Sequence, residues 1–140
     1  MTLSDEDRDE MIKHHMEKSE KAFKTAVLLS GTDDYDAAAN RAYYSIFRAE
    51  KALLLTKGIL GDRHKHVHNA ISEEFVKLGI LSEDTNKKIK LAEKIRYIGD
   101  YSDTESVEKN QAEKIISEAG KFLGIAKELI AKFKLEQERP

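Results

Sequence analysis

The chain has 140 residues, of which 40% are hydrophobic and 36% are charged, with 24 Lys and Arg against 26 Asp and Glu. This balance argues against non-specific coating of nucleic acid, and the absence of cysteine excludes disulfides and thiolate metal sites. No hydrophobic run reaches the ~18 residues of a membrane span, and the acidic start is unlike a signal peptide. We therefore expect a soluble, cytoplasmic protein with one domain over residues 1–140.

Hydrophobic residues recur at steps of three and four along most of the chain, which predicts helices. The single proline is the last residue, and several glycines stand where helices should end. Five helices are expected, over residues 4–30, 34–57, 64–78, 82–101 and 104–137. Because the first and last carry long hydrophobic stripes, the predicted fold is all-α, an up-and-down bundle of about five helices.

The second expected helix has two unlike faces. One face consists of small residues that would let another helix approach closely: Ala38, Ala42, Ser45, Ala49 and Ala52. The other places Arg41, Tyr44 and Arg48 three and four residues apart, so two guanidinium groups flank one phenol. Arg with Tyr is typical of a surface that binds a protein or a stacked base. The alternative is a solvated face whose Arg side chains cover apolar surface.

The fourth expected helix carries Arg96 on the stripe that also holds Ile89 and Ala92. An unpaired charge in a core is costly, so Arg96 should either pair with Asp100, one turn later, or face an interface or groove. Several lysines precede Arg96 and form the one basic cluster of the chain. This cluster suits phosphate contacts, although a solvated lysine-rich face would look the same in sequence.

Three histidines, His64, His66 and His68, lie near the start of the third expected helix. His64 and His68 could share a helix face, but no carboxylate accompanies them in the manner of known zinc motifs. We therefore expect no metal and no cofactor. The chain also lacks a glycine-rich phosphate loop and a nucleophile motif, so the residues alone indicate no reaction.

Three segments resemble the HEPN family (higher eukaryotes and prokaryotes nucleotide-binding). The run Asn40–Leu54 is similar to the second helix of that family. The segment from Lys65-His66 to Phe75 is similar to the start of its third helix. Arg96-Tyr-Ile-Gly-Asp-Tyr101 resembles the Arg-x-x-x-Asp-Tyr at the end of its fourth helix. The resemblance covers about residues 10–130 and points to the small stand-alone prokaryotic type. It implies a helical bundle that forms homodimers, often beside a minimal nucleotidyltransferase, as a toxin–antitoxin module.

Many HEPN domains are metal-independent RNases whose active site is Arg-x4–6-His, composed across the dimer. After Arg96, the positions for that histidine hold Tyr101, Ser102 and Asp103, so the obvious proton carrier is missing. Arg63 and His68 have the right spacing, but at a different place in the chain.

Two functions follow from the resemblance. The preferred hypothesis is a non-catalytic module that binds a nucleotide, RNA or a nucleotidyltransferase partner. Its candidate binding residues are Arg41, Tyr44, Arg48, Arg96, Asp100 and Tyr101. The alternative is a divergent metal-independent endoribonuclease, a toxin that uses Arg96 with a displaced histidine, either His66 or His68.

Overall fold

The computed structural model describes residues 3–139 and consists of helices joined by short connections. The helices are α1 (Asp5–Gly31), α2 (Tyr35–Leu55), α3 (His64–Ile71), α4 (Glu83–Tyr101) and α5 (Lys109–Gln137), with a π-helical turn, Ser72–Val76, that continues α3. Within the described residues there is no β-strand. The predicted all-α bundle of five helices is therefore confirmed.

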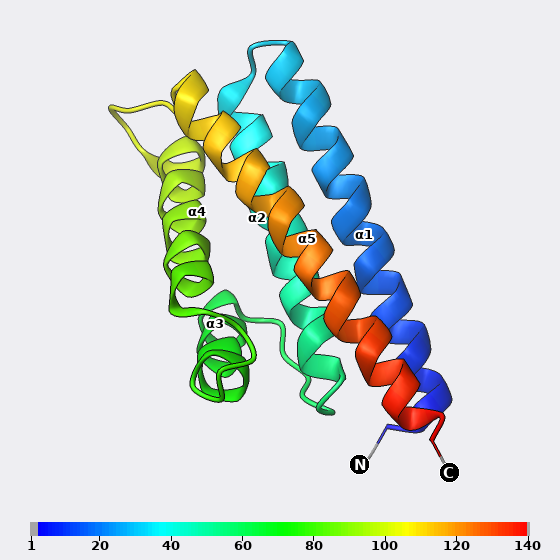
Figure 1. Ribbon diagram of the computed structural model, residues 1–140. Coiled ribbons are helices and arrows are strands. Elements are labelled where there is room, and N and C mark those ends of the chain that lie inside the picture. The colour runs from blue at the N-terminus through cyan, green and yellow to red at the C-terminus, as the bar shows by residue number, and fades with distance from the viewer. Residues whose placement is uncertain (1–2, 140) are drawn as a thin grey trace.

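Helix α2 is the centre of the bundle and contacts every other helix (Figure 1). The long helices α1 and α5 lie along it, α4 covers another side, and the short α3 lies near the start of α4. The small residues that the sequence places on one face of α2 are fully buried. They let α1 come close enough for the Ser19 hydroxyl to donate a 2.6 Å hydrogen bond to the Ser45 carbonyl oxygen.

The start of the last helix was predicted wrongly. Helix α5 begins at Lys109, five residues later than the 104 expected from the sequence. Two contacts hold the preceding segment out of a helix: the Ser102 hydroxyl accepts from the Glu105 amide at 2.9 Å, and the Asp36 carboxylate accepts from the Val107 amide at 2.7 Å. Val107 is 5% exposed, so its burial against the bundle favours this extended path.

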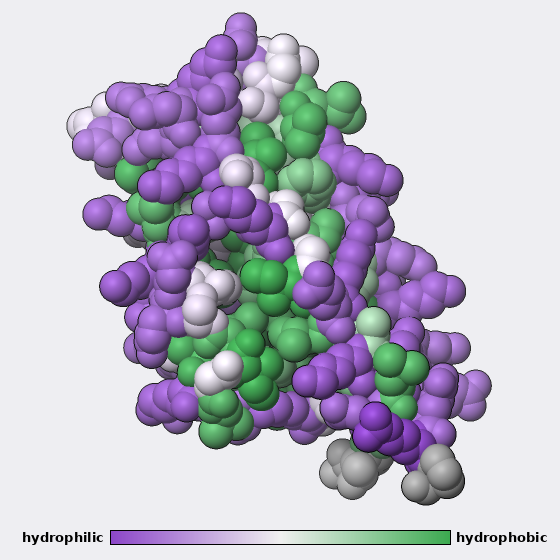
Figure 2. All heavy atoms as spheres, viewed as in Figure 1, coloured by the Kyte–Doolittle hydropathy of each residue, from purple (hydrophilic) through white to green (hydrophobic). Residues whose placement is uncertain are grey.

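The surface is dominated by charged side chains. Figure 2 shows a mostly hydrophilic face on which hydrophobic side chains collect in the seams between helices. None of the helices between residues 3 and 139 combines the length and the hydrophobicity that crossing a bilayer requires.

Candidate functional site

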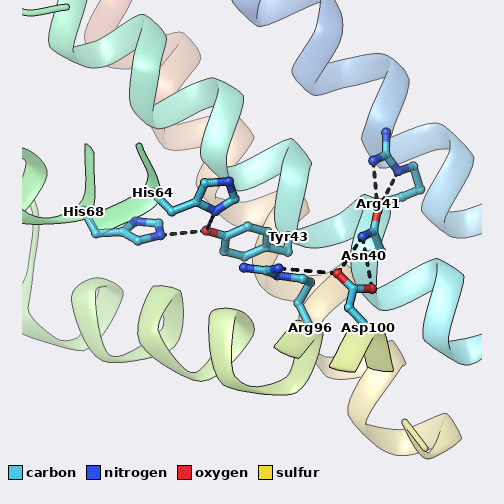
Figure 3. Close-up of polar contacts among 7 residues, drawn as sticks. All are labelled: Asn40, Arg41, Tyr43, His64, His68, Arg96 and Asp100. Atoms are coloured by element: carbon cyan, nitrogen blue, oxygen red, sulfur yellow. Dashed lines mark hydrogen bonds and ion pairs between the residues drawn. The ribbon is translucent and has the colours of Figure 1, made fainter. Parts of the chain in front are cut away.

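A buried phenol, Tyr43 of α2, lies at the centre of a polar network that joins three helices (Figure 3). Its hydroxyl is 2.7 Å from Nδ1 of His64 and 2.8 Å from Nε2 of His68, both on α3. The guanidinium carbon of Arg96, on α4, lies 4.6 Å from the centre of the Tyr43 ring. Residues more than 50 positions apart thus meet at one aromatic ring.

His68 lies between two carboxylates. Its Nδ1 is 2.9 Å from Oε1 of Glu50, whose side chain is completely buried, and its Nε2 is 2.7 Å from Oε2 of Glu93. Burial alone would lower the pKa of His68, but the hydrogen bond to Glu50 and the charges of both carboxylates outweigh it, so the pKa of His68 is raised. Burial raises the pKa of Glu50, an effect that the contact with His68 opposes.

The pKa of His64 is shifted in the opposite direction from that of His68. Burial and the nearby positive charge of Arg96 lower the pKa of His64, so its neutral ring can accept a hydrogen bond at Nδ1. Burial raises the pKa of Tyr43, which keeps its proton. The consistent arrangement has the Tyr43 hydroxyl donating to His64 while the protonated His68 donates to Glu50 and Glu93.

The network continues from Arg96 along α4 and back to α2. Arg96 is 8% exposed, and its Nη1 lies 3.4 Å from Oδ2 of Asp100, so the structure shows the ion pair that was one of the two alternatives for Arg96. The Asn40 amide donates to both oxygens of Asp100, at 3.2 and 3.0 Å. In turn, Nε and Nη2 of Arg41 donate to the Asn40 side-chain oxygen. Arg96 and Arg41 are therefore the two ends of one chain of polar contacts.

A second feature is a groove between α1 and α2, which we call the basic groove. Its polar lining includes Lys18 and Lys21 from α1 and Arg41, Tyr44 and Arg48 from α2, and its volume is about 420 Å³. Among the residues that the structure describes, no carboxylate lines it. The Arg41 guanidinium lies 5.1 Å from the centre of the Tyr44 ring, within the range of a cation–π contact. The three α2 residues singled out in the sequence therefore share a groove, joined there by two lysines.

Arg48 is oriented by a buried histidine of α1. Its Nη1 donates to Nδ1 of His15 at 3.0 Å. Burial and the positive charges of Lys51 and Arg48 lower the pKa of His15 to about 4, so His15 is the neutral acceptor that this contact needs.

The other predicted site residues divide between the network and the surface. Asp100 and His68 belong to the network, whereas Tyr101 is 61% exposed and packs against Tyr97, with ring centres 4.9 Å apart. His66 is exposed and makes no contact with the network.

Sequence reasoning missed four members of the network. They are Asn40, Tyr43, Glu50 and Glu93. The seven-residue spacing of Tyr43 and Glu50 places them on one face of α2, which was the one available signal for that pair. Among residues 3–139, no three His, Asp or Glu side chains are arranged to hold a metal ion.

Comparison with known proteins identifies relatives along nearly the whole chain. The HEPN domain model matches residues 12–129. A Methanocaldococcus jannaschii protein named "Putative toxin MJ0142" is 36% identical over 88% of this chain and 84% of its own length. A second protein of that organism, "Putative toxin MJ0605", is 34% identical over 86% of this chain and 90% of its own. A "UPF0332 protein" of Thermotoga maritima is 29% identical over 91% of this chain and 97% of its own length. The family match and the all-helical fold agree with each other, and this chain belongs to the HEPN domain family.

Proposed function

We propose that this HEPN protein is a toxin-like component that binds single-stranded RNA along the basic groove without cleaving it. The carrying observation is that four cationic side chains line the same groove as Tyr44, whereas no carboxylate of residues 3–139 lines it. The relatives named as toxins support a role of this kind. Since the whole chain carries a net charge of −2, this concentration of positive charge is local rather than general.

The groove has the two components that sequence-tolerant RNA binding uses. Lysine and arginine side chains neutralise phosphates, and an aromatic face stacks a base at about 1–3 kcal/mol per base. The hydrogen bonds from Arg41 to Asn40 and from Arg48 to His15 hold both guanidinium groups in place before a ligand arrives. Less conformational entropy is then lost on binding.

The test is fluorescence anisotropy with a labelled single-stranded oligoribonucleotide at several salt concentrations. Lys21→Glu combined with Arg48→Glu should weaken binding about tenfold or more at low salt, and Tyr44→Leu should weaken it without changing the salt slope. Lys132→Glu combined with Lys134→Glu is the control matched in charge, since both lysines are exposed α5 residues outside the groove. Equal affinity for the control and for the double variant would refute the proposal.

A second candidate function is metal-independent RNA cleavage, and one observation favours it: His68 and Arg96 both contact Tyr43. In such a reaction the 2′-oxygen forms a bond to phosphorus and the bond from phosphorus to the 5′-oxygen breaks. A general base takes the proton from the 2′-hydroxyl, and a general acid gives a proton to the departing 5′-oxygen. A protonated His68 would be the acid, with Glu50 orienting the ring, and Arg96 would stabilise the charged phosphorane. Here phosphate must displace Asp100 from Arg96.

Incubation of labelled RNA with purified protein in EDTA distinguishes the two functions. If the chain is the non-catalytic module, wild type and His68→Gln leave the RNA equally intact. Cleavage that His68→Gln and Arg96→Ala abolish, and that His66→Gln leaves unchanged, would establish the ribonuclease instead. His66 is the matched control because it lies outside the network.

We further propose that the 140 residues fold as one domain that forms a homodimer and pairs with a nucleotidyltransferase. Tyr97 and Tyr101, exposed side by side on α4, support a protein contact at that surface because tyrosine is enriched at interfaces. Sedimentation should give a dimer at micromolar concentration, and calorimetry a single unfolding transition. A monomer at high concentration, or two transitions, would contradict these proposals. Co-expression with the product of a neighbouring nucleotidyltransferase gene should give a complex that co-purifies.

A further inference from the structure

A pocket of about 660 Å³ lies between α3 and α4 and shares no lining residue with the basic groove. We call it the α3–α4 pocket. Its α4 residues run from Asn86 to Ile98, so the pocket is elongated along that helix. Asn86 and Tyr97, near its two ends, are separated by about 16 Å of helix axis. A compact group cannot contact both ends, so a ligand that fills the pocket must be elongated as well.

The end of the pocket at Asn86 holds an amide without a partner. Asn86 is 7% exposed, yet no side-chain hydrogen bond among residues 3–139 involves its amide. Its polar atoms are not among the fully enclosed ones, so they open onto the pocket that Asn86 lines. A buried amide without a partner costs free energy, and a ligand with a matching donor and acceptor would remove that cost. One residue of an extended peptide presents its N–H and its C=O on the same side, and this pair matches the amide.

The middle of the pocket carries cations and one carboxylate. Lys65, Lys90 and Lys94 line it, and none of the ion pairs within the described residues uses them. These ammonium groups are available for acidic side chains. Glu93 also lines the pocket, 2.7 Å from His68, with 42% of its side chain exposed. Because a carboxylate accepts hydrogen bonds and repels anions, it suits a chain with N–H donors better than the closely spaced phosphates of a nucleic acid.

The far end of the pocket is apolar. Ile98 lines it together with Tyr97, whose side chain is 60% exposed. An apolar side chain of a ligand would pack against this ring and leave water. Along α4, the pocket therefore offers a hydrogen-bonding amide, then cations, then an aromatic ring.

We propose that the α3–α4 pocket binds an extended acidic segment of a protein partner. One residue of its backbone pairs with the amide of Asn86, its carboxylates contact the lysines, and an apolar side chain packs on Tyr97. Since an extended chain rises about 3.3 Å per residue, about five residues span the pocket. The inference goes beyond the proposed RNA binding and does not depend on it. For the protein contact proposed at Tyr97, it names the chemistry of the segment that docks.

Fluorescence anisotropy with labelled five-residue peptides tests the proposal. Each probe has four glutamates and one phenylalanine, placed at the amino end in one peptide and at the carboxyl end in the other, so that both chain directions are covered. The matched control peptides have lysine in place of glutamate, and a labelled uridine oligonucleotide tests for a nucleic-acid surface instead.

Three protein variants locate the binding site. Lys90→Glu with Lys94→Glu reverses the charge of the pocket, and Lys87→Glu with Lys132→Glu is the control matched in charge, since both lysines are exposed and lie outside the pocket. Asn86→Leu keeps the side-chain volume and removes the donor and the acceptor. Circular dichroism checks that Asn86→Leu is folded; because the amide has no partner to lose, its melting temperature should not fall.

The proposal expects saturable binding of an acidic peptide that the Lys90 and Lys94 double variant weakens about tenfold or more and that the control pair leaves unchanged. Asn86→Leu should weaken it about fivefold or more. Methylating the backbone nitrogen of each peptide residue in turn gives a second test that leaves the protein unaltered. At one position the methyl group should weaken binding to wild type and have no effect on binding to Asn86→Leu.

Four results would overturn the proposal. They are no saturable binding of either acidic peptide, equal binding of the lysine peptides, equal affinity of wild type and Asn86→Leu for the acidic peptide, and a loss of uridine oligonucleotide binding in the Lys90 and Lys94 variant that exceeds its loss of peptide binding. The last would make the pocket a nucleic-acid surface.

The outcome is separable from those of the proposed functions. Lys21→Glu with Arg48→Glu changes the basic groove alone and should leave peptide affinity unchanged, so RNA binding and peptide binding fail independently. If no complex forms with the nucleotidyltransferase while the acidic peptide still binds through Asn86, that partner is wrong and the pocket stands.

Discussion

The carboxylate of Glu50 lies 2.9 Å from Nδ1 of His68, although the Glu50 side chain has no exposed surface at all. A buried charge without a partner is strongly destabilising, so Glu50 and His68 are each required by the other. The contact joins α2 to α3 and orients the imidazole towards Tyr43 and Glu93. It therefore connects the stability of the bundle to the ionisation of one histidine.

Replacing Glu50 with Gln should lower the pKa of His68. The carboxylate hydrogen bond and charge are what raise that pKa against the opposing effect of burial, and an amide supplies no charge. Titration of the His68 ring proton by NMR measures the change. His66, exposed and on the same helix, is the internal reference. An unchanged His68 pKa would mean that Glu50 is protonated in the native protein.

The stability that His68 contributes should be lost at high pH. The folded-state pKa of His68 is raised, so its contribution is fully present below about 6.5, the ordinary histidine pKa, and disappears as pH rises through the raised value. Urea unfolding of wild type and His68→Gln across that pH window should show stabilities that converge as pH increases. A gap that widens with pH would show that the imidazole is neutral in the fold.

His15 should act in the opposite direction. Its pKa is lowered to about 4, so the folded protein favours the neutral ring, and stability should fall as pH drops from about 6.5 towards 4. Melting temperatures at pH 7 and pH 5 check this prediction. His15→Gln, which cannot be protonated, should lose less stability over that interval than wild type does. Equal losses in the two proteins would contradict it.

Tyr43→Phe should cost about 1–3 kcal/mol of unfolding free energy, because it removes a hydroxyl that contacts both histidines and leaves Nδ1 of the half-buried His64 without a partner. The ring volume and the contact with Arg96 remain. Tyr35→Phe is the control, since the Tyr35 hydroxyl makes an exposed hydrogen bond to Asp33. If the two substitutions changed the unfolding free energy in urea by similar amounts, the network would not be a source of stability.

Phe122→Ala should destabilise the bundle by about 3–5 kcal/mol, because this α5 side chain is 3% exposed and its removal leaves a cavity. Leu135→Ala, at a position 65% exposed on the same helix, should change the unfolding free energy by less than about 0.5 kcal/mol. Chemical denaturation monitored by circular dichroism measures both. A small effect at Phe122 would indicate that the core repacks.

The sequence determined the class of fold because helical periodicity is a local property. The stripes of α1 and α5 and the small face of α2 could be read directly, and burial followed from them. The pairing of Arg96 with Asp100 was one of the two alternatives that the sequence offered for Arg96, since residues four apart in a helix lie on the same face.

Only the tertiary structure decided which distant residues meet. Glu50 approaches His68 because of the path that the α2–α3 connection takes. Arg96 approaches Tyr43 because of the way α4 packs across α2. No local spacing in the sequence encodes either contact. The late start of α5 has the same origin. A helix was expected from residue 104, but the carboxylate of Asp36, 71 positions from Val107, accepts a hydrogen bond from the Val107 amide and holds this segment out of the helix. Contacts between helices outweighed local preference in each case, because a buried charge or donor must find its partner wherever the chain supplies one.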